Sequence, residues 1–431
     1  MAVAEADDVL ITINEKLDSI VGSHSECCIF RVRDALRNVN DKSYEPEIIS
    51  IGPYHRNKPH LQMMEEHKWR FLKSRRDDEL RHCVAAMRSL EEKARRCYSE
   101  PIDISSKDFV TMLLLDGCFV LELIRKFKIY KDPAQLALNG PRQENTENDP
   151  VFRMEWILAT LQRDLMLFEN QLPFFVLCKL HEMIEPPGQL DQLMGTALEF
   201  FNDLLPVRGE KRQLSAPRAD NIKHLLDLIH RCWSSLNPVH NRDSTWNHDT
   251  VDFIGSSTEL AVAGIRFEKM ETVTFDVVFN DGLLQIPVFV VEDRTESYLR
   301  NLIAHEQHCG NASLNIVTDY MAFFGCLIKS VEDVQTLSRH GILRSFVGDS
   351  EAVCRMFRTM DSCIVGPGKN LHYAPLFKKV NSHCDRCLNK WMASFQRKYI
   401  HSSWGIISIL AASTLLLLAL LQVIYQIKCA G

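Results

Sequence analysis

The feature that most constrains this chain is a single uncharged apolar run near its C-terminal end. The run extends from Trp404 to Ile427 and reads WGIISILAASTLLLLALLQVIYQI, with only mild polar side chains. As a helix, its 24 residues would measure roughly 36 Å, enough for a hydrocarbon core of about 30 Å. Trp404 and Tyr425 lie near its two ends, where aromatic rings favour the membrane interface. The run therefore predicts one C-terminal transmembrane helix.

Basic residues gather on the N-terminal side of this run. Positions 362–431 hold eight Lys or Arg and one acidic residue, whereas the rest of the chain holds 42 basic and 55 acidic residues. By the positive-inside rule, Lys390, Arg397 and Lys398 place the long N-terminal body in the cytosol. The first residues are acidic and lack the apolar core of a signal peptide. We therefore expect a tail-anchored, single-pass membrane protein whose basic neck contacts the lipid bilayer.

Composition excludes several other classes of protein. Apolar residues make up 46% of the chain and charged residues 25%, which is typical of a globular protein and not of a disordered one. The net charge is −6 and no strongly basic domain is present, so no nucleic-acid partner is expected. The 14 cysteines are scattered without a regular framework, which favours a reducing compartment over a disulfide scaffold.

The periodicity of apolar residues predicts a mainly α fold with a small antiparallel β-sheet, plus the transmembrane helix. Expected helices cover residues 61–98, 109–127, 151–183 with an interruption at Pro173, 224–233, 295–308, 316–329, 330–340 and 349–361. Asn280-Asp281-Gly282 predicts a hairpin turn between strands over 273–279 and 283–291, and a further strand is expected over 264–267. Pro287 suggests an edge position for its strand.

Four parts of the chain are distinguished on this basis. They are an N-terminal segment (1–28), a mostly helical domain (29–361) with its β-hairpin region near 264–291, a basic juxtamembrane neck (362–403) and the membrane helix (404–427).

Motifs with known chemistry are incomplete. His305-Glu306-Gln307-His308 has its second histidine at i+3, whereas the zinc-protease motif needs it at i+4, where Cys309 stands. His383-Cys384 with Cys387 supplies half of a zinc site without a second pair. Phosphate-loop and serine-nucleophile signatures are absent. We therefore expect no metal and no cofactor.

Acidic residues inside apolar stretches leave two readings open. Asp116 and Glu122 lie within an apolar helical pattern, and Glu169-Asn170-Gln171 separates two apolar runs just before Pro173. Such groups can serve as catalytic carboxylates, but they more often satisfy backbone groups or pair with basic side chains. We interpret them as structural, together with the turn at Gly52-Pro53, and expect no catalytic residues.

Several ordered motifs resemble a plant-specific family catalogued as domain of unknown function two-four-seven. The resemblance extends from about Ile29 to Tyr425. The matching stretches include Ile29-Phe30-Arg31-Val32, Tyr44-Glu45-Pro46, Ile49-Ser50-Ile51-Gly52-Pro53-Tyr54-His55, Leu115-Asp116-Gly117-Cys118-Phe119 with Glu122, Glu169-Asn170-Gln171-Leu172-Pro173-Phe174-Phe175, and Asn301-Leu302-Ile303-Ala304 with Glu306-Gln307.

The resemblance implies a plant membrane protein of undefined biochemistry. Some grass members of that family are implicated in pollen–stigma self-incompatibility, and no catalytic residues are established for it. The family usually has phenylalanine where His305 stands, which argues against a metal role for that histidine. Our hypothesis is a membrane-anchored, non-enzymatic protein-recognition or signalling scaffold with an unknown protein partner. The alternative is an unrecognised membrane-proximal enzyme that uses buried carboxylates.

Overall fold

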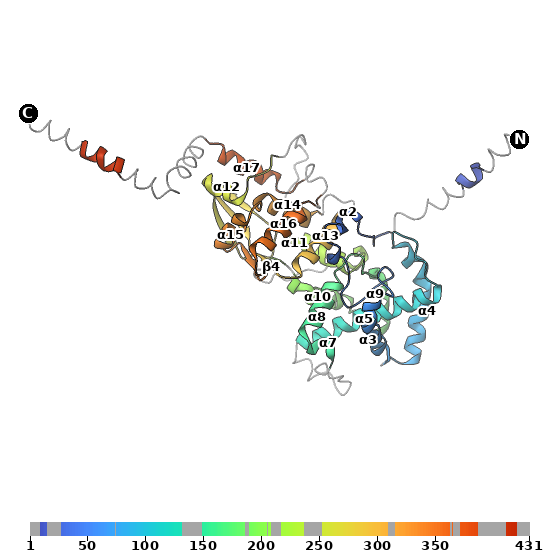
Figure 1. Ribbon diagram of the computed structural model, residues 1–431. Helices are drawn as coiled ribbons and strands as arrows, with labels where there is room; N and C mark the ends of the chain where they lie inside the picture. The colour runs from blue at the N-terminus through green and yellow to red at the C-terminus, as the bar shows by residue number, and fades with distance from the viewer. Residues whose placement is uncertain are drawn as a thin grey trace, which may run out of the picture.

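The architecture is mainly helical, with two small sheets in the C-terminal half (Figure 1). The computed structural model describes residues 9–14, 27–73, 75–131, 149–185, 189–204, 206–207, 217–236, 252–308, 315–362, 364, 371–386 and 411–419.

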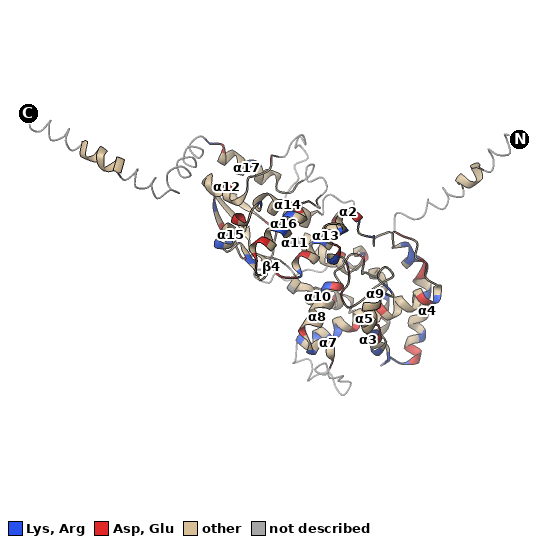
Figure 2. Cartoon of the chain, viewed as in Figure 1, with Lys and Arg blue, Asp and Glu red and all other residues tan. Residues whose placement is uncertain are grey.

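The N-terminal half is built around α5 (Ser106–Lys131), a helix of 26 residues that is buried on nearly all sides. Its apolar residues do not form a single stripe, and a helix that is apolar all round must be covered by others. The helices that pack on it are α3 (Gln62–Lys73), α4 (Asp77–Arg96), α9 (Phe174–Ile184) and α10 (Leu190–Phe201). By contrast, α4 is amphipathic, with Cys83, Met87 and Ala94 buried, and it lies at the edge of the molecule with charged residues along its length (Figure 2).

The C-terminal half packs a second group of helices beside the sheets. Its members are α11 (Leu225–Leu236), α12 (Ser257–Val262), α13 (Thr295–His308), α14 (Ile316–Leu327), α15 (Val331–Arg339) and α16 (Ser350–Asp361). Twelve of twelve residues of α14 are buried, and α14 packs against α13 and α16. Capping boxes begin α12 at Ser256 and α15 at Ser330, so both helix starts are fixed by local hydrogen bonds.

The remaining elements are short. They are α2 (Asp34–Arg37), η1 (Asp41–Ser43), η2 (Pro59–Leu61), α7 (Pro150–Arg153), α8 (Glu155–Asp164), η4 (Asn202–Leu204), η5 (Ala219–Asn221) and α17 (Ala374–Cys384). A further helical turn covers residues 9–14.

Sheet pairing differs from the predicted antiparallel sheet. The strands β1 (Arg266–Met270), β2 (Val278–Asn280) and β3 (Leu283–Pro287) lie in the order β1-β3-β2. The hairpin between β2 and β3 is antiparallel, but β1 runs parallel to β3, and β4 (Phe289–Val291) runs parallel to β5 (Leu343–Ser345). The prediction was wrong here because the side-chain alternation of a strand is the same in both kinds of pair.

The expected edge position of Pro287 is also wrong. Its strand, β3, lies between the other two strands of its sheet. Pro287 occupies the last position of that strand, opposite Met270. A proline is tolerated at a strand end because the ladder stops there and loses little from the missing N–H.

One predicted helix is divided, because the expected helix over 61–98 is two helices, α3 and α4. The interruption expected at Pro173 within 151–183 is confirmed, since non-helical chain separates α8 from α9, which begins directly after Pro173. This break includes Glu169-Asn170-Gln171, and the Asn170 and Gln171 side chains donate to the carbonyls of Asp164 and Leu165, which a continued helix would have satisfied itself.

The predicted transmembrane helix is corrected by the structure. No helix among the described residues is both long and apolar enough to cross a membrane. Of the predicted span 404–427, only residues 411–419 are described, as helix with exposed side chains. Lys390, Arg397, Lys398 and Trp404 lie outside the described residues. The predicted single-pass, tail-anchored membrane protein, and the membrane localisation derived from it, are therefore wrong.

Candidate functional site

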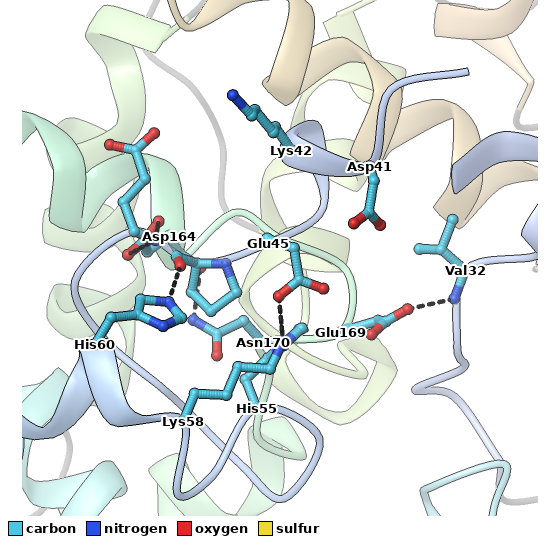
Figure 3. Close-up of polar contacts among 12 residues, drawn as sticks. Val32, Asp41, Lys42, Glu45, His55, Lys58, His60, Asp164, Glu169 and Asn170 are labelled. Carbon is cyan, nitrogen blue, oxygen red and sulfur yellow. Dashed lines mark hydrogen bonds and ion pairs between the residues drawn. The ribbon is translucent and has the colours of Figure 1, made fainter. Parts of the chain in front are cut away.

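A buried polar network joins segment 28–60 to the loop between α8 and α9. Both stretches are largely non-helical, so many of their backbone groups need partners from elsewhere. Figure 3 shows Glu45, His55, Glu169 and Asn170 gathered between these two stretches. The residues that sequence analysis singled out around Glu169 thus lie at the junction between segments far apart in the chain.

Glu169 is the anionic centre of this network. Its side chain is completely inaccessible to solvent. Oε1 accepts the backbone N–H of Val32 at 2.7 Å, while Oε2 accepts from Arg37 Nη2 at 2.8 Å and from Arg31 Nη1 at 3.2 Å. Burying a carboxylate is costly unless charges and donors surround it, and here both oxygens have such partners. The arrangement fixes the start of segment 28–60 against the loop.

His55 lies between two carboxylates. Its ring is fully buried, with Nε2 3.5 Å from Glu169 Oε2 and Nδ1 3.5 Å from Glu45 Oε2. Both distances are long for a hydrogen bond. Burial, reinforced by the positive charge of Lys58, lowers the pKa of His55 to about 3, even though Glu45 acts in the opposite direction. His55 is therefore neutral at physiological pH.

Glu45, the second carboxylate beside His55, is ionised at physiological pH. Burial raises the pKa of Glu45, but hydrogen bonds from Lys58 and Arg37 outweigh it and lower the pKa to about 2. Glu45 is thus an ionised partner of basic side chains, which is a structural role.

Because of His55, we expect the free energy of unfolding to decrease as the pH is lowered below about 6.5. The unfolded chain binds a proton near pH 6.5, whereas the folded chain resists it down to about 3. One such group adds a slope of up to about 1.4 kcal/mol per pH unit within that window. His55→Gln should make the dependence of unfolding free energy on pH shallower, as measured by urea unfolding between pH 6.5 and 4. His82→Gln, at an exposed site on α4, should leave the slope unchanged; an equal slope in both variants would contradict this role of His55.

Asp164 and Asn170 hold the strand-like stretch 47–51 in place. Asp164 accepts backbone N–H groups from Glu47, Ile48 and Ile49 within 3.1 Å. Burial raises the pKa of Asp164, and these N–H donors oppose the shift. Asn170 accepts from Ile51 N at 2.7 Å and donates to the carbonyl of Ile49 at 3.1 Å. The two side chains therefore supply hydrogen-bond partners to backbone N–H and C=O groups of 47–51 that are not paired with a neighbouring strand.

Gln171 completes the loop itself. Its side-chain nitrogen donates to the carbonyls of Leu165 and Leu167 at 2.7 and 2.8 Å. Its side-chain oxygen accepts the backbone N–H of Leu226 at 3.3 Å. The residue therefore ties the loop to α11.

Asp116 forms a second buried ion pair, with Lys68, next to the turn at Gly52-Pro53. Its Oδ1 accepts from Lys68 Nζ at 2.7 Å and its Oδ2 from the backbone N–H of Gly52 at 2.9 Å. Burial raises the pKa of Asp116, and the Lys68 charge opposes the shift. Pro53 follows Gly52 in this turn and is half-buried. Gly52 adopts φ +74°, a backbone conformation that favours glycine.

Glu122 lies on α5 but not in this network. It pairs with Arg125 at 2.5 Å on its own helix and with Arg75 at 3.6 Å. The structure therefore brings together Gly52, Asp116, Glu169, Asn170 and Gln171 around one junction, and leaves Glu122, which is also buried, to separate ion pairs with arginines.

A groove opens beside this junction, where α3 passes the preceding loop. Its volume is about 400 Å³, and its lining residues are Ser50, Asn57, Lys58, Leu61, Gln62, Met63, Glu65, Glu66 and Trp69. Met63 and Trp69 are 78% and 54% exposed, which is unusual for such large apolar side chains. Glu65, which accepts a hydrogen bond from Lys68, lines this groove. The buried carboxylates of the network do not line it.

Sequence analysis missed three features of this region and its surroundings. It did not identify His55 as a neighbour of Glu169 and Glu45, or the groove beside Trp69. It also missed a buried cluster of Asp227, His230 and His305, which comes from two helices. Only the amphipathic pattern of α3, with Trp69 on its polar side, could have signalled the groove.

Together, these observations describe a mainly helical domain in which buried, ionised side chains hold distant segments of the chain together. The chain belongs to the DUF247 family, described as plant proteins of unknown function, whose model matches residues 29–418. A UPF0481 protein of Arabidopsis thaliana is 31% identical over 423 residues, covering 92% of this chain and 85% of the relative. A putative UPF0481 protein of the same organism is 24% identical over 518 residues, covering 96% and 93%. No solved structure matches the chain.

Proposed function

We propose that this protein acts without catalysis, by binding another protein through the groove beside Trp69. The observation that carries the proposal is the exposure of Trp69 and Met63 at the rim of a hollow on an otherwise charged helix, α3. Tryptophan and methionine are enriched in the cores of protein interfaces, and tryptophan is among the commonest hot-spot residues.

The charge of the groove favours a basic partner segment. The Glu66 side chain is 79% exposed, and its nearest cation, Arg70, is 3.9 Å away. Glu65 is held by Lys68, and Lys58 is held by Glu45, so neither changes the local balance much. A partner that offers an arginine or lysine next to an apolar side chain would pair the cation with Glu66 and with the face of Trp69.

The buried carboxylates support a binding role over the enzymatic alternative. Asp116, Asp164 and Glu169 accept hydrogen bonds from backbone N–H groups or basic side chains, and they are almost fully inaccessible to solvent. A catalytic carboxylate needs to reach a substrate within about 3 Å. These side chains point into the protein instead.

We expect Trp69→Ala to weaken the binding of basic-apolar peptides by about 30-fold or more, since a hot-spot residue contributes at least about 2 kcal/mol. The measurement is binding of the full chain to a peptide array in which basic, acidic and apolar positions are varied systematically, followed by titration of the best peptides. Glu66→Lys should shift the preference from basic to acidic peptides.

Trp156→Ala is the matched control. Trp156 is 59% exposed, lies on α8 and does not line the groove. This variant should bind as the original chain does. Equal loss in the two tryptophan variants, or a preference of the original chain for acidic peptides, would contradict the proposed binding surface.

A further inference from the structure

A buried cluster of two histidines and one aspartate lies where α11 meets α13. Asp227, His230 and His305 each offer one ligand atom, and these atoms lie within 4.8 Å of one another. Asp227 and His230 are three positions apart on α11, so they share a face of that helix. His305 comes from α13, which packs against α11. All three residues are at most 2% exposed.

We propose that this cluster binds a divalent transition-metal ion of the zinc class, which ties α11 to α13. Two imidazoles and one carboxylate are ligands typical of zinc. Zinc bonds to nitrogen and oxygen measure about 2.0–2.1 Å, so the ligand atoms of a tetrahedral site lie about 3.4 Å apart. His305 Nε2 and Asp227 Oδ1 are 3.3 Å apart, which matches that edge.

His230 is prepared as a ligand by a second carboxylate. Its Nε2 lies 2.7 Å from Glu306 Oε1, and Nδ1 is buried without a hydrogen-bond partner. When Nε2–H donates to the carboxylate, Nδ1 carries the lone pair that a metal requires. Carboxylate–histidine pairs of this kind orient the ligands of most zinc sites. Glu306 is itself fixed by the backbone N–H groups of Val317 and Thr318, at 3.0 and 2.8 Å.

Asp227 can bind the ion without losing its other contacts. Its Oδ2 accepts from the backbone N–H of Lys223 and from Arg231 Nε, both at 2.8 Å, which leaves Oδ1 directed at His305. The ion takes the place of the hydrogen between Oδ1 and His305 Nε2, and His305 binds as the tautomer protonated at Nδ1. The negative charges of Asp227 and Glu306 balance the two positive charges of the ion.

The neighbouring histidine, His224, is not one of the three ligands. Its ring centroid is 5.0 Å from that of His305, but its Nδ1 accepts the backbone N–H of Asp227 at 3.2 Å. In the neutral ring this places the proton on Nε2, so neither nitrogen offers a lone pair to the cluster. Because the cluster is closed to solvent, the ion has a structural role, and its binding is coupled to folding.

The test uses the full chain with any affinity tag removed, stripped with a chelator and then titrated with Zn²⁺. We expect one equivalent to bind and the Tm to rise by a few degrees at a hundredfold excess over Kd. His305→Phe keeps an aromatic ring of similar shape and should weaken zinc binding by at least about 100-fold. His340→Phe, at an exposed site at the end of α15, should bind zinc as the original chain does. Equal zinc-dependent shifts in these two variants, or no stoichiometric binding by the original chain, would overturn the proposal.

A second measurement needs no variant. X-ray absorption at the zinc edge should show nitrogen and oxygen ligands at about 2.0–2.1 Å with the outer-shell signal of imidazole. In the cobalt-substituted protein, the near-ultraviolet spectrum should lack a thiolate-to-cobalt charge-transfer band. Sulfur at about 2.3 Å in the zinc spectrum would assign the metal to cysteines elsewhere and refute the site.

Discussion

Replacing Glu169 by glutamine is expected to lower the free energy of unfolding by roughly 3 kcal/mol. The amide keeps the shape of the side chain and can still accept the Val32 N–H, but it removes the negative charge that faces Arg31 and Arg37. Removing one partner from a buried ion pair costs about 3–5 kcal/mol. The lower end applies because the side chains of Arg31 and Arg37 are 41% and 17% exposed and regain some water.

The measurement for Glu169→Gln is denaturant unfolding at pH 7, followed by circular dichroism. Glu199→Gln is the control, because Glu199 is exposed on α10 and should change stability by less than about 0.5 kcal/mol. If both variants unfolded at the same denaturant concentration, Glu169 would not anchor segment 28–60, and the network would have no structural role.

The sequence indicates the helices of the scaffold better than it indicates their partners. α5 was predicted over 109–127 and covers Ser106–Lys131, because a long apolar run permits few other structures. The turn at Asn280-Asp281-Gly282 was also predictable, since Asp281 and Gly282 adopt the positive φ values that this sequence favours. Both features depend on neighbours within a few residues.

Contacts between distant segments left no comparable signal. Glu169 and Val32 are 137 positions apart, and His230 and Glu306 are 76 apart. A polar triplet between two apolar runs indicates that Glu169 needs partners, but nothing local identifies them. For the same reason, the spacing of His305 and His308 on one helix gave no metal site, whereas the cluster of Asp227, His230 and His305 combines ligands from two helices.

At the C-terminal end, by contrast, the sequence predicted a feature that the structure corrects. Its length and lack of charge favoured a membrane span, and the orientation assigned to Lys390, Arg397 and Lys398 depended on that span. Yet no helix among the described residues, which include only 411–419 of this run, is long and apolar enough to cross a membrane. The prediction depended on the apolar length and lack of charge of one segment alone, and the finding corrects it.

Replacing Gly52 by alanine should lower the free energy of unfolding more than the same replacement at Gly264 or Gly195. Gly52 has φ +74°, and a Cβ atom at this position would lie 2.5 Å from the backbone carbonyl oxygen of Gln171. The strained backbone costs about 1–2 kcal/mol and the overlap about 1–3 kcal/mol more. The overlap is with backbone, and that carbonyl also accepts from Tyr98 Oη at 3.1 Å, so it cannot move away without loss. We expect a total loss of roughly 2–5 kcal/mol, measured by denaturant unfolding.

Two further glycines separate backbone strain from crowding. Gly264 has φ +89° with no atom within 4 Å of an added Cβ, so Gly264→Ala should cost only the strain, about 1–2 kcal/mol. Gly195 lies in α10 with open space around it, and Gly195→Ala should raise stability by up to about 1 kcal/mol through helix propensity. A Gly52→Ala variant as stable as Gly264→Ala would mean that the turn and the loop at Gln171 can separate at no cost. In that case the close packing of the turn on the loop would not hold segment 28–60 to the helical scaffold, and the hydrogen bonds of Glu169, Asp164 and Asn170 would have to do so.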